Sequence, residues 1–152
     1  MPEQEQVPAV IDSFRDKYFF LSNFYEDVDG YILERDFQAT KATNDEDRNR
    51  ILSAKTAKDA KHIGDTIECR KDWKDIRLAV MHRLVKAKFS KFPFAGLLKK
   101  TQDAELIEGN WWHDTYWGVC DGVGENHLGK ILMLVRAELI EEDKEADEAF
   151  DK

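Results

Sequence analysis

Three polar side chains at helical spacing are the first candidates for chemistry in this chain. Glu34, Gln38 and Lys41 follow one another at intervals that place them on one face of a helix beginning near Glu34. Phe37 lies beside this stripe, and the apolar residues 31–33 come just before it. In a partly buried place, a carboxylate, an amide and an amine tune one another's proton affinity, as an acid/base site requires. The alternative interpretation is an ordinary solvated helix face.

A second carboxylate lies among tryptophans. Asp114 follows Trp111 and Trp112 and precedes Trp117. Indole rings exclude water, and partial desolvation would suit this carboxylate to a role as an acid or a base. Asp114 is therefore the second catalytic candidate, and Trp117 with the adjoining Gly118 is a candidate for substrate binding.

Further residues suit the binding of a flat, polar, phosphorylated ligand, because ring faces beside sparse polar groups line such pockets. Trp73 is a candidate for stacking on a base, and the first core residue of a long helix is an equal alternative. Arg70 can grip a phosphate with two bonds. Asn126 precedes the last predicted helix as an N-cap, where free backbone N–H groups attract anions; an ordinary glycine loop is the alternative. Phe20, Ser22 and Asn23 are candidates for the pocket lining.

The elements that must position these residues are mostly helical. We predict a single compact, helix-rich α+β domain over residues 1–142 with a few short strands, followed by an acidic, disordered tail over 143–152. Strands are expected at 10–14 and 18–20, with a turn at 29–30. Helices are expected from residue 34, at 45–54, at 56–63 with Gly64 as a C-cap, and at 72–89, 94–100 and 126–142.

Composition bounds the function. The net charge of −8 disfavours general binding to nucleic acid, which depends on neutralising phosphates. No apolar run reaches the roughly 20 residues of a membrane span. The two cysteines, Cys69 and Cys120, indicate a reducing compartment, so a cytoplasmic location is expected. The four histidines are scattered without metal-ligand spacing, and no cofactor fingerprint is present; we expect neither metal nor cofactor.

Six short blocks, taken together, resemble the NADAR family, the YbiA-like N-glycosidases. They are Leu21-Ser-Asn-Phe24, Glu34-x-x-Phe-Gln-Ala-x-Lys41, Arg70-x-Asp-Trp73, Arg77-x-x-x-Met81, Asp114-x-x-Trp-Gly118 and Asn126-x-Leu-Gly-Lys130. They arrive in the family's order and span nearly the whole domain. One departure is Asp65, where family members often carry an arginine after the glycine matched by Gly64. Lys61 and Arg70 are the alternatives for the phosphate contact.

The resemblance implies hydrolysis of a ribosyl N-glycosidic bond. The implied substrates are a base such as guanine that carries ADP-ribose, free or in nucleic acid, or a phosphorylated ribosylamino-pyrimidine of riboflavin synthesis. Glu34 is then the carboxylate nearest the anomeric carbon, where positive charge grows in the transition state. Lys41 either forms a Schiff base with the opened ribose or holds a phosphate and orients Glu34. A module that binds ADP-ribose or NAD without chemistry is the alternative.

Overall fold

Helices dominate the computed structural model, which describes residues 6–151. In chain order the elements are β1 (Val10–Ile11), the 3₁₀ helix η1 (Asp16–Leu21), α1 (Leu33–Ala39), α2 (Asp45–Leu52), α3 (Ala57–Thr66), α4 (Trp73–Phe89), α5 (Phe94–Lys99), β2 (Glu105–Leu106), β3 (Gly109–Asn110), β4 (Val119–Cys120) and α6 (His127–Phe150). The strands pair in parallel, β1 with β2 and β3 with β4. The predicted helix-rich α+β domain is confirmed.

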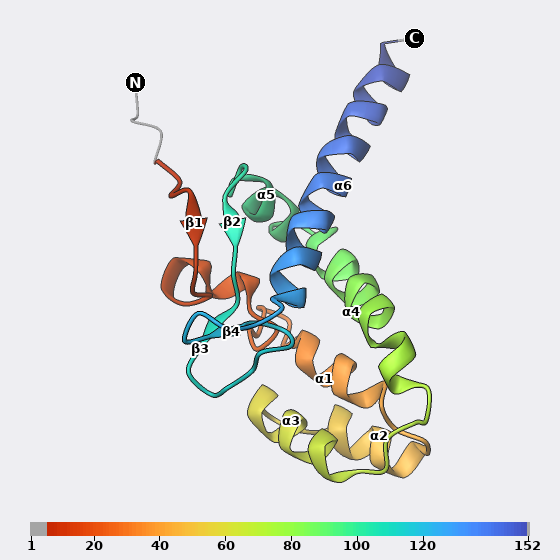
Figure 1. Cartoon of the computed structure of the whole chain (residues 1–152). Helices are drawn as coiled ribbons and strands as arrows, with labels where there is room; N and C mark the ends of the chain where they lie inside the picture. Colours follow the sequence, from red (N-terminus) through yellow and green to blue (C-terminus); the bar gives the residue numbers. More distant parts are fainter. Residues whose placement is uncertain (1–5, 152) are drawn as a thin grey trace.

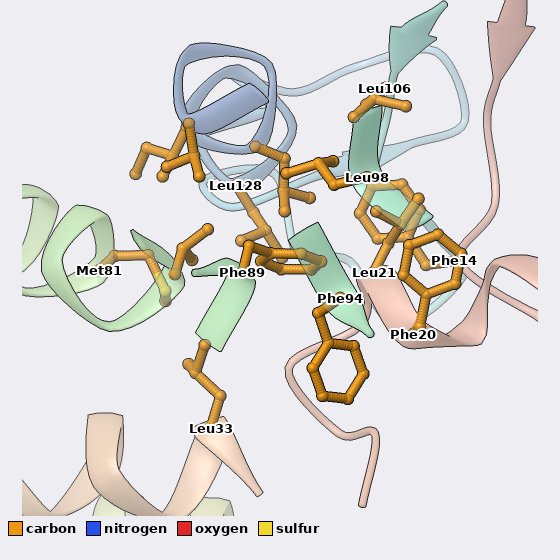
Figure 2. Close-up of a cluster of buried hydrophobic side chains, with 14 of the residues drawn as sticks. Phe14, Phe20, Leu21, Leu33, Met81, Phe89, Phe94, Leu98, Leu106 and Leu128 are labelled. Carbon is orange, nitrogen blue, oxygen red and sulfur yellow. The ribbon is translucent and has the colours of Figure 1, made fainter. Parts of the chain in front are cut away.

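The core lies where α4, α5 and α6 meet η1 and β2. On α6, Leu128, Ile131, Leu132, Val135 and Leu139 are all buried, as their helical spacing predicted. Figure 2 shows this cluster, with Phe89 of α4, Phe94 of α5 and Leu21 of η1 converging below α6. The first helix, α1, packs against α2, α3 and α4. In Figure 1 the helices α1, α2 and α3 gather at one end of the molecule, while the C-terminal part of α6 projects from the other.

Two predicted strands differ in the structure. Only Val10 and Ile11 of the first one pair with a neighbour, β2. The second is the 3₁₀ helix η1, because the chain closes i to i+3 hydrogen bonds, from Tyr18 N to Arg15 O and from Ser22 N to Phe19 O. This turn buries Phe20 and Leu21 and exposes Phe19. The predicted turn at 29–30 is present and is closed by an antiparallel bridge between residues 26 and 32.

Helix ends also differ from the predictions. Gly64 is not a C-cap but an internal, buried residue of α3, which continues to Thr66. The last helix, predicted to end at Glu142, continues through the acidic segment to Phe150. Ion pairs from Lys86 of α4 to Glu142 and from Lys99 of α5 to Asp143 fix the middle of α6, and helix-forming residues prolong it. Residues 143–150 are therefore helical, where the sequence predicted a disordered tail. Within residues 6–151, no helix has both the length and the apolar character needed to cross a membrane.

Candidate active site

A cavity of about 480 Å³ opens where the segment after η1, the helices α1, α3 and α4, and the segment 108–117 meet. Its volume lies within the range of small-molecule sites, roughly 300–1,000 Å³. Eight of the twelve residues predicted for the site line it: Glu34, Lys41, Asp114, Ser22, Asn23, Gln38, Trp73 and Trp117. Segments far apart in the sequence thus supply one cavity.

Glu34 is the buried carboxyl of this cavity, on the first turn of α1. Its backbone N–H donates to the carbonyl of Asn23 (3.1 Å), and its Oε1 accepts from Nε2 of Gln38 at 2.7 Å. Burial raises the pKa of Glu34 to about 7, and the hydrogen bond from Gln38 and the charges of Lys61 and Lys41 only partly oppose that rise. A carboxyl that exchanges its proton near neutral pH is suited to acid/base catalysis.

Gln38 positions Glu34, and the room for its side chain depends on glycine at residue 64. Gln38 is buried, and its amide N–H reaches back one turn to the carboxyl of Glu34. A Cβ atom at residue 64 would overlap Oε1 of Gln38, so α3 can approach α1 this closely only with glycine there. The glycine matched to the family pattern therefore permits the close packing of α3 on α1 beside the cavity.

The charged residues of α1 and α3 that face the cavity are mixed in sign. Lys41, predicted on the same helix as Glu34, lies in the turn just after α1. Its Nζ is 3.9 Å from Oδ1 of Asp65 and 5.9 Å from the ring centroid of Trp73. Lys61 lines the cavity from α3. Of the two alternatives for a phosphate contact, Lys61 is thus at the cavity. A covalent role for Lys41 stays a prediction.

Glu108 is a second carboxyl of the cavity that the sequence reasoning missed. It is half-buried, and its Oε2 accepts from Nδ2 of Asn110 at 3.0 Å. Burial raises its pKa to about 7; Asn110 opposes this, while the charges of Asp114 and Glu34 add to it. The only sequence feature that could have indicated Glu108 as a site residue is its place directly after the apolar pair 106–107 and before a glycine.

Asp114 lines the cavity and also holds its own loop. Its Oδ1 accepts from the backbone N–H groups of Tyr116 (3.2 Å) and Trp117 (2.9 Å). The side chain of Asn110 closes the other side, accepting from Asp114 N and donating to Asp114 O. The geometry gives Asp114 a positioning function for Trp117, and its catalytic role stays a prediction.

Aromatic rings form the apolar wall. Phe37 lies between two indoles, with ring centroids 5.1 Å from Trp73 and 5.4 Å from Trp117. Trp73 is both the first core residue of α4 and part of the cavity lining; its stacking on a base stays a prediction. A flat, partly polar leaving group fits against such a wall.

Lys88 holds the loop that carries Ser22 and Asn23. Its Nζ donates to the carbonyls of Phe20 (2.7 Å) and Ser22 (3.0 Å) from inside a cluster of rings that includes Phe89. Burial lowers the pKa of Lys88 to about 7. This buried lysine, unnoticed in the sequence, fixes one wall of the cavity by way of the backbone.

Four predicted site residues lie outside the cavity lining. Phe20 belongs to the core, in edge contact with Phe89. Arg70 donates two hydrogen bonds, of 2.6 and 2.9 Å, to the carboxylate of Asp72, the residue before α4, which makes no side-chain cap hydrogen bond. Gly118 is required because a Cβ atom there would overlap Glu108.

Asn126, the fourth, is buried and has a left-handed backbone with φ of 54°. Its side chain accepts from Glu108 N (3.0 Å) and donates to Leu106 O (2.9 Å). Asn126 occupies the predicted N-cap position of α6, but its side chain makes no cap hydrogen bond. The side chain instead anchors the strand segment that ends in Glu108.

Two arginines add positive charge at the cavity. The guanidinium of Arg77 on α4 lies 3.6 Å from the ring centroid of Tyr116, and Arg15 lies before η1. Within residues 6–151 the buried Nε of Arg77 has no hydrogen-bond partner, so a ligand anion would satisfy it. The same part of the chain contains no cluster of three or more His, Cys, Asp or Glu side chains arranged to hold a metal ion.

Comparisons with known proteins agree with this geometry. A family model described as NADAR domain matches residues 12–140. A riboflavin biosynthesis protein of Vibrio vulnificus is 39% identical over 132 residues, which are 80% of this chain and 36% of that protein's length. The N-glycosidase YbiA of Escherichia coli is 33% identical over 137 residues, 84% of this chain and 85% of that protein. The NMR structure of E. coli YbiA matches with a TM-score of 0.80 at 30% identity, covering 95% of this chain and 93% of that one.

Proposed function

This chain belongs to the NADAR domain family, and on that premise we propose that it is a hydrolase that cleaves a ribosyl N-glycosidic bond. The observation that carries the proposal is the pair of carboxyls, Glu34 and Glu108, that line one cavity and titrate near neutral pH. Breaking a glycosidic bond calls for two such groups, one protonated and one ionised.

The proton count of the pair suits the reaction. With each pKa at about 7, the two carboxyls together hold about one proton near neutral pH. Lys61 favours the ionised form of both carboxyls, Lys41 adds to this at Glu34, and the charges of Asp65 and Asp114 oppose it at Glu34 and Glu108 respectively. Because the two pKa values are alike, we assign Glu34 as the carboxylate from the family resemblance, which leaves Glu108 as the acid.

The reaction then balances as a hydrolysis. Glu108 donates its proton to the departing nitrogen as the C1′–N bond breaks, and the negative charge of Glu34 stabilises the oxocarbenium-like ribose. Water adds to C1′ and gives its proton to Glu34, so the products are a free base or amine and a ribose with a C1′ hydroxyl. A proton passes between the carboxyls, through solvent, to complete the cycle.

The remaining lining suits a ribosyl phosphate. The rings of Phe37, Trp73 and Trp117 offer an apolar face to the leaving base. Lys61 and Arg77 offer positive charge to phosphate. The two substrate classes are a guanine that carries ADP-ribose and a phosphorylated ribosylamino-pyrimidine. The two relatives named above, an N-glycosidase and a riboflavin biosynthesis protein, support the reaction class and the second substrate class respectively.

The test is a cleavage assay with both substrates, followed by mass spectrometry of the released base or amine. We expect the wild type to cleave at least one of them, with a bell-shaped dependence of rate on pH centred near 7. Glu34→Gln and Glu108→Gln should each lower the rate by about 10²–10⁴-fold. Glu46→Gln, an exposed residue of α2, is the matched control and should leave the rate unchanged.

Two outcomes would count against the proposal. Full activity in both the Glu34 and Glu108 variants would exclude the carboxyl pair as the catalytic groups. Tight binding of ADP-ribose without cleavage of either substrate would favour the alternative of a non-catalytic module for ADP-ribose or NAD.

A further inference from the structure

Arg77 lines the cavity from α4 with its guanidinium stacked on an aromatic ring. The central carbon of the guanidinium lies 3.6 Å from the ring centroid of Tyr116, the distance of a contact with the face of the ring. Stacking occupies the face of a guanidinium and leaves the N–H groups in its plane for other partners. Among the residues that the structure describes, Arg77 has neither a carboxylate partner nor a hydrogen-bond acceptor. Its donors are therefore unsatisfied within the protein.

The start of α6, an alternative place for an anion, is bonded within the protein. The backbone N–H groups of residues 126–128 donate to the carbonyls of residues 116–118, at 3.0 to 3.3 Å. Backbone donors used in this way do not offer the anion site of a free helix N-terminus. Lys41 and Arg70 each lie beside an aspartate. Among the described residues, Arg77 is the one cation of the lining with a buried donor that lacks an acceptor.

Tyr116 lies outside the cavity lining and is itself fixed by its neighbours. Its ring centroid is 4.5 Å from that of His127 and 4.9 Å from that of Trp117. Its carbonyl accepts from His127 N at 3.1 Å, and its N–H donates to Oδ1 of Asp114 at 3.2 Å. A ring held by both backbone and side-chain contacts is a fixed surface, so a guanidinium stacked on it loses less freedom when it binds an anion.

Resting on the proposed function, we infer that Tyr116 is a positioning residue of the substrate site. With His127 packed against it, Tyr116 holds the guanidinium of Arg77 so that the N–H edge binds the phosphate of the ribosyl substrate. The planar fork of a guanidinium matches the geometry of phosphate, and two parallel donors fix the orientation of the phosphate as well as its place. Tyr116 acts through Arg77, and the role is the same for either phosphorylated substrate class.

The first test measures the binding of ribose 5-phosphate by titration calorimetry. Arg77→Met should weaken binding by about 10- to 150-fold, the range for hydrogen bonds to a charged group. Tyr116→Leu should weaken it by about 2- to 30-fold, the range for a cation on a ring, whereas Tyr116→Phe keeps the ring and should bind as the wild type does. The matched control is Lys91→Met, which removes the cation stacked on Tyr31, outside the cavity lining. It should leave the affinity unchanged.

A double variant separates positioning from general damage to the fold. If Tyr116 acts through Arg77, Tyr116→Leu should cause little further loss of affinity in the Arg77→Met background. In cleavage assays both single variants should raise KM more than they lower kcat. If the wild type cleaves neither substrate, the proposed function fails, yet the same pattern of ribose 5-phosphate affinities would still support the inference.

Three results would overturn the inference. One is an equal loss of affinity from Tyr116→Leu with and without Arg77→Met. Another is a loss in Tyr116→Phe as large as that in Tyr116→Leu, because the hydroxyl and not the ring would then matter. The third is a wild type that shows no measurable binding of ribose 5-phosphate at millimolar concentration.

Discussion

Replacing Glu34 by glutamine tests whether this carboxyl is as strongly perturbed as its burial implies. Glutamine keeps the shape of a protonated glutamate and can still accept the hydrogen bond from Gln38, but it carries no proton to lose. The wild type must ionise Glu34 inside the protein as the pH rises. The variant should therefore lose catalysis and, at neutral and higher pH, gain stability.

The size of the gain follows from the pKa. Burial raises the pKa of Glu34 from 4.5 to about 7, and each pH unit is worth about 1.4 kcal/mol. Between these values the folded state holds more protons than the unfolded state, so the free energy of unfolding of the wild type falls as the pH rises. The total fall from this group is about 3 kcal/mol. It is complete above the folded pKa and absent below pH 4.5.

Urea unfolding of the wild type and Glu34→Gln at pH 4 and pH 8 measures this difference. At pH 4 the two proteins should be equally stable within about 1 kcal/mol; at pH 8 the variant should be more stable by about 3 kcal/mol, or about 6–12 °C in Tm. Glu46→Gln, on the exposed face of α2, should follow the wild type at both pH values. If the difference in stability between Glu34→Gln and the wild type were the same at pH 4 and pH 8, the argument would be refuted, because Glu34 would then ionise in the folded protein as it does in water.

Three further changes probe what surrounds the carboxyls. Gly64→Ala places a Cβ atom against Oε1 of Gln38, so we expect thermal unfolding to show a loss of about 1–3 kcal/mol and the rate of cleavage to fall as Gln38 moves from Glu34. The Cβ atom added by Gly118→Ala would overlap Glu108 and displace its carboxyl. The variant's rate should then no longer fall at high pH through the ionisation of Glu108, and an unchanged pH–rate profile would contradict the assignment of Glu108 as the acid. Lys88→Met removes the amine that donates to the carbonyls of Phe20 and Ser22, which should lower the free energy of unfolding in urea by about 1–3 kcal/mol. Because burial lowers the pKa of Lys88 to about 7, the variant should also lack the wild-type gain in stability between pH 7 and 10.5.

Local spacing was enough to predict the helices and one face of the site. The apolar positions of α4 and α6 repeat at the period of a helix. The five such residues of α6 are buried, and on α4 Trp73, Val80 and Val85 are buried while Ile76 and Leu84 are half-buried. Glu34 and Gln38 share a face of α1 because helix geometry fixes their relative positions, and Lys41, in the turn after α1, lines the same cavity. The strand predicted at 18–20 was wrong, since an apolar aromatic run fits a buried 3₁₀ turn as well as it fits a strand.

Only the tertiary structure decided which charges meet and what they do. Glu108 lies far from Glu34 in the chain, and no local pattern shows that both line one cavity. Gly64 was wrongly predicted to end a helix, and Asn126 begins α6 as predicted but turns its side chain to the 106–108 segment. Both roles depend on which neighbour approaches the residue, which local patterns do not show. The pKa values of Glu34 and Glu108 depend on burial, which the packing of distant segments creates. Sequence periodicity fixes what lies on one element, whereas desolvation and long-range contacts exist only once the elements are packed together.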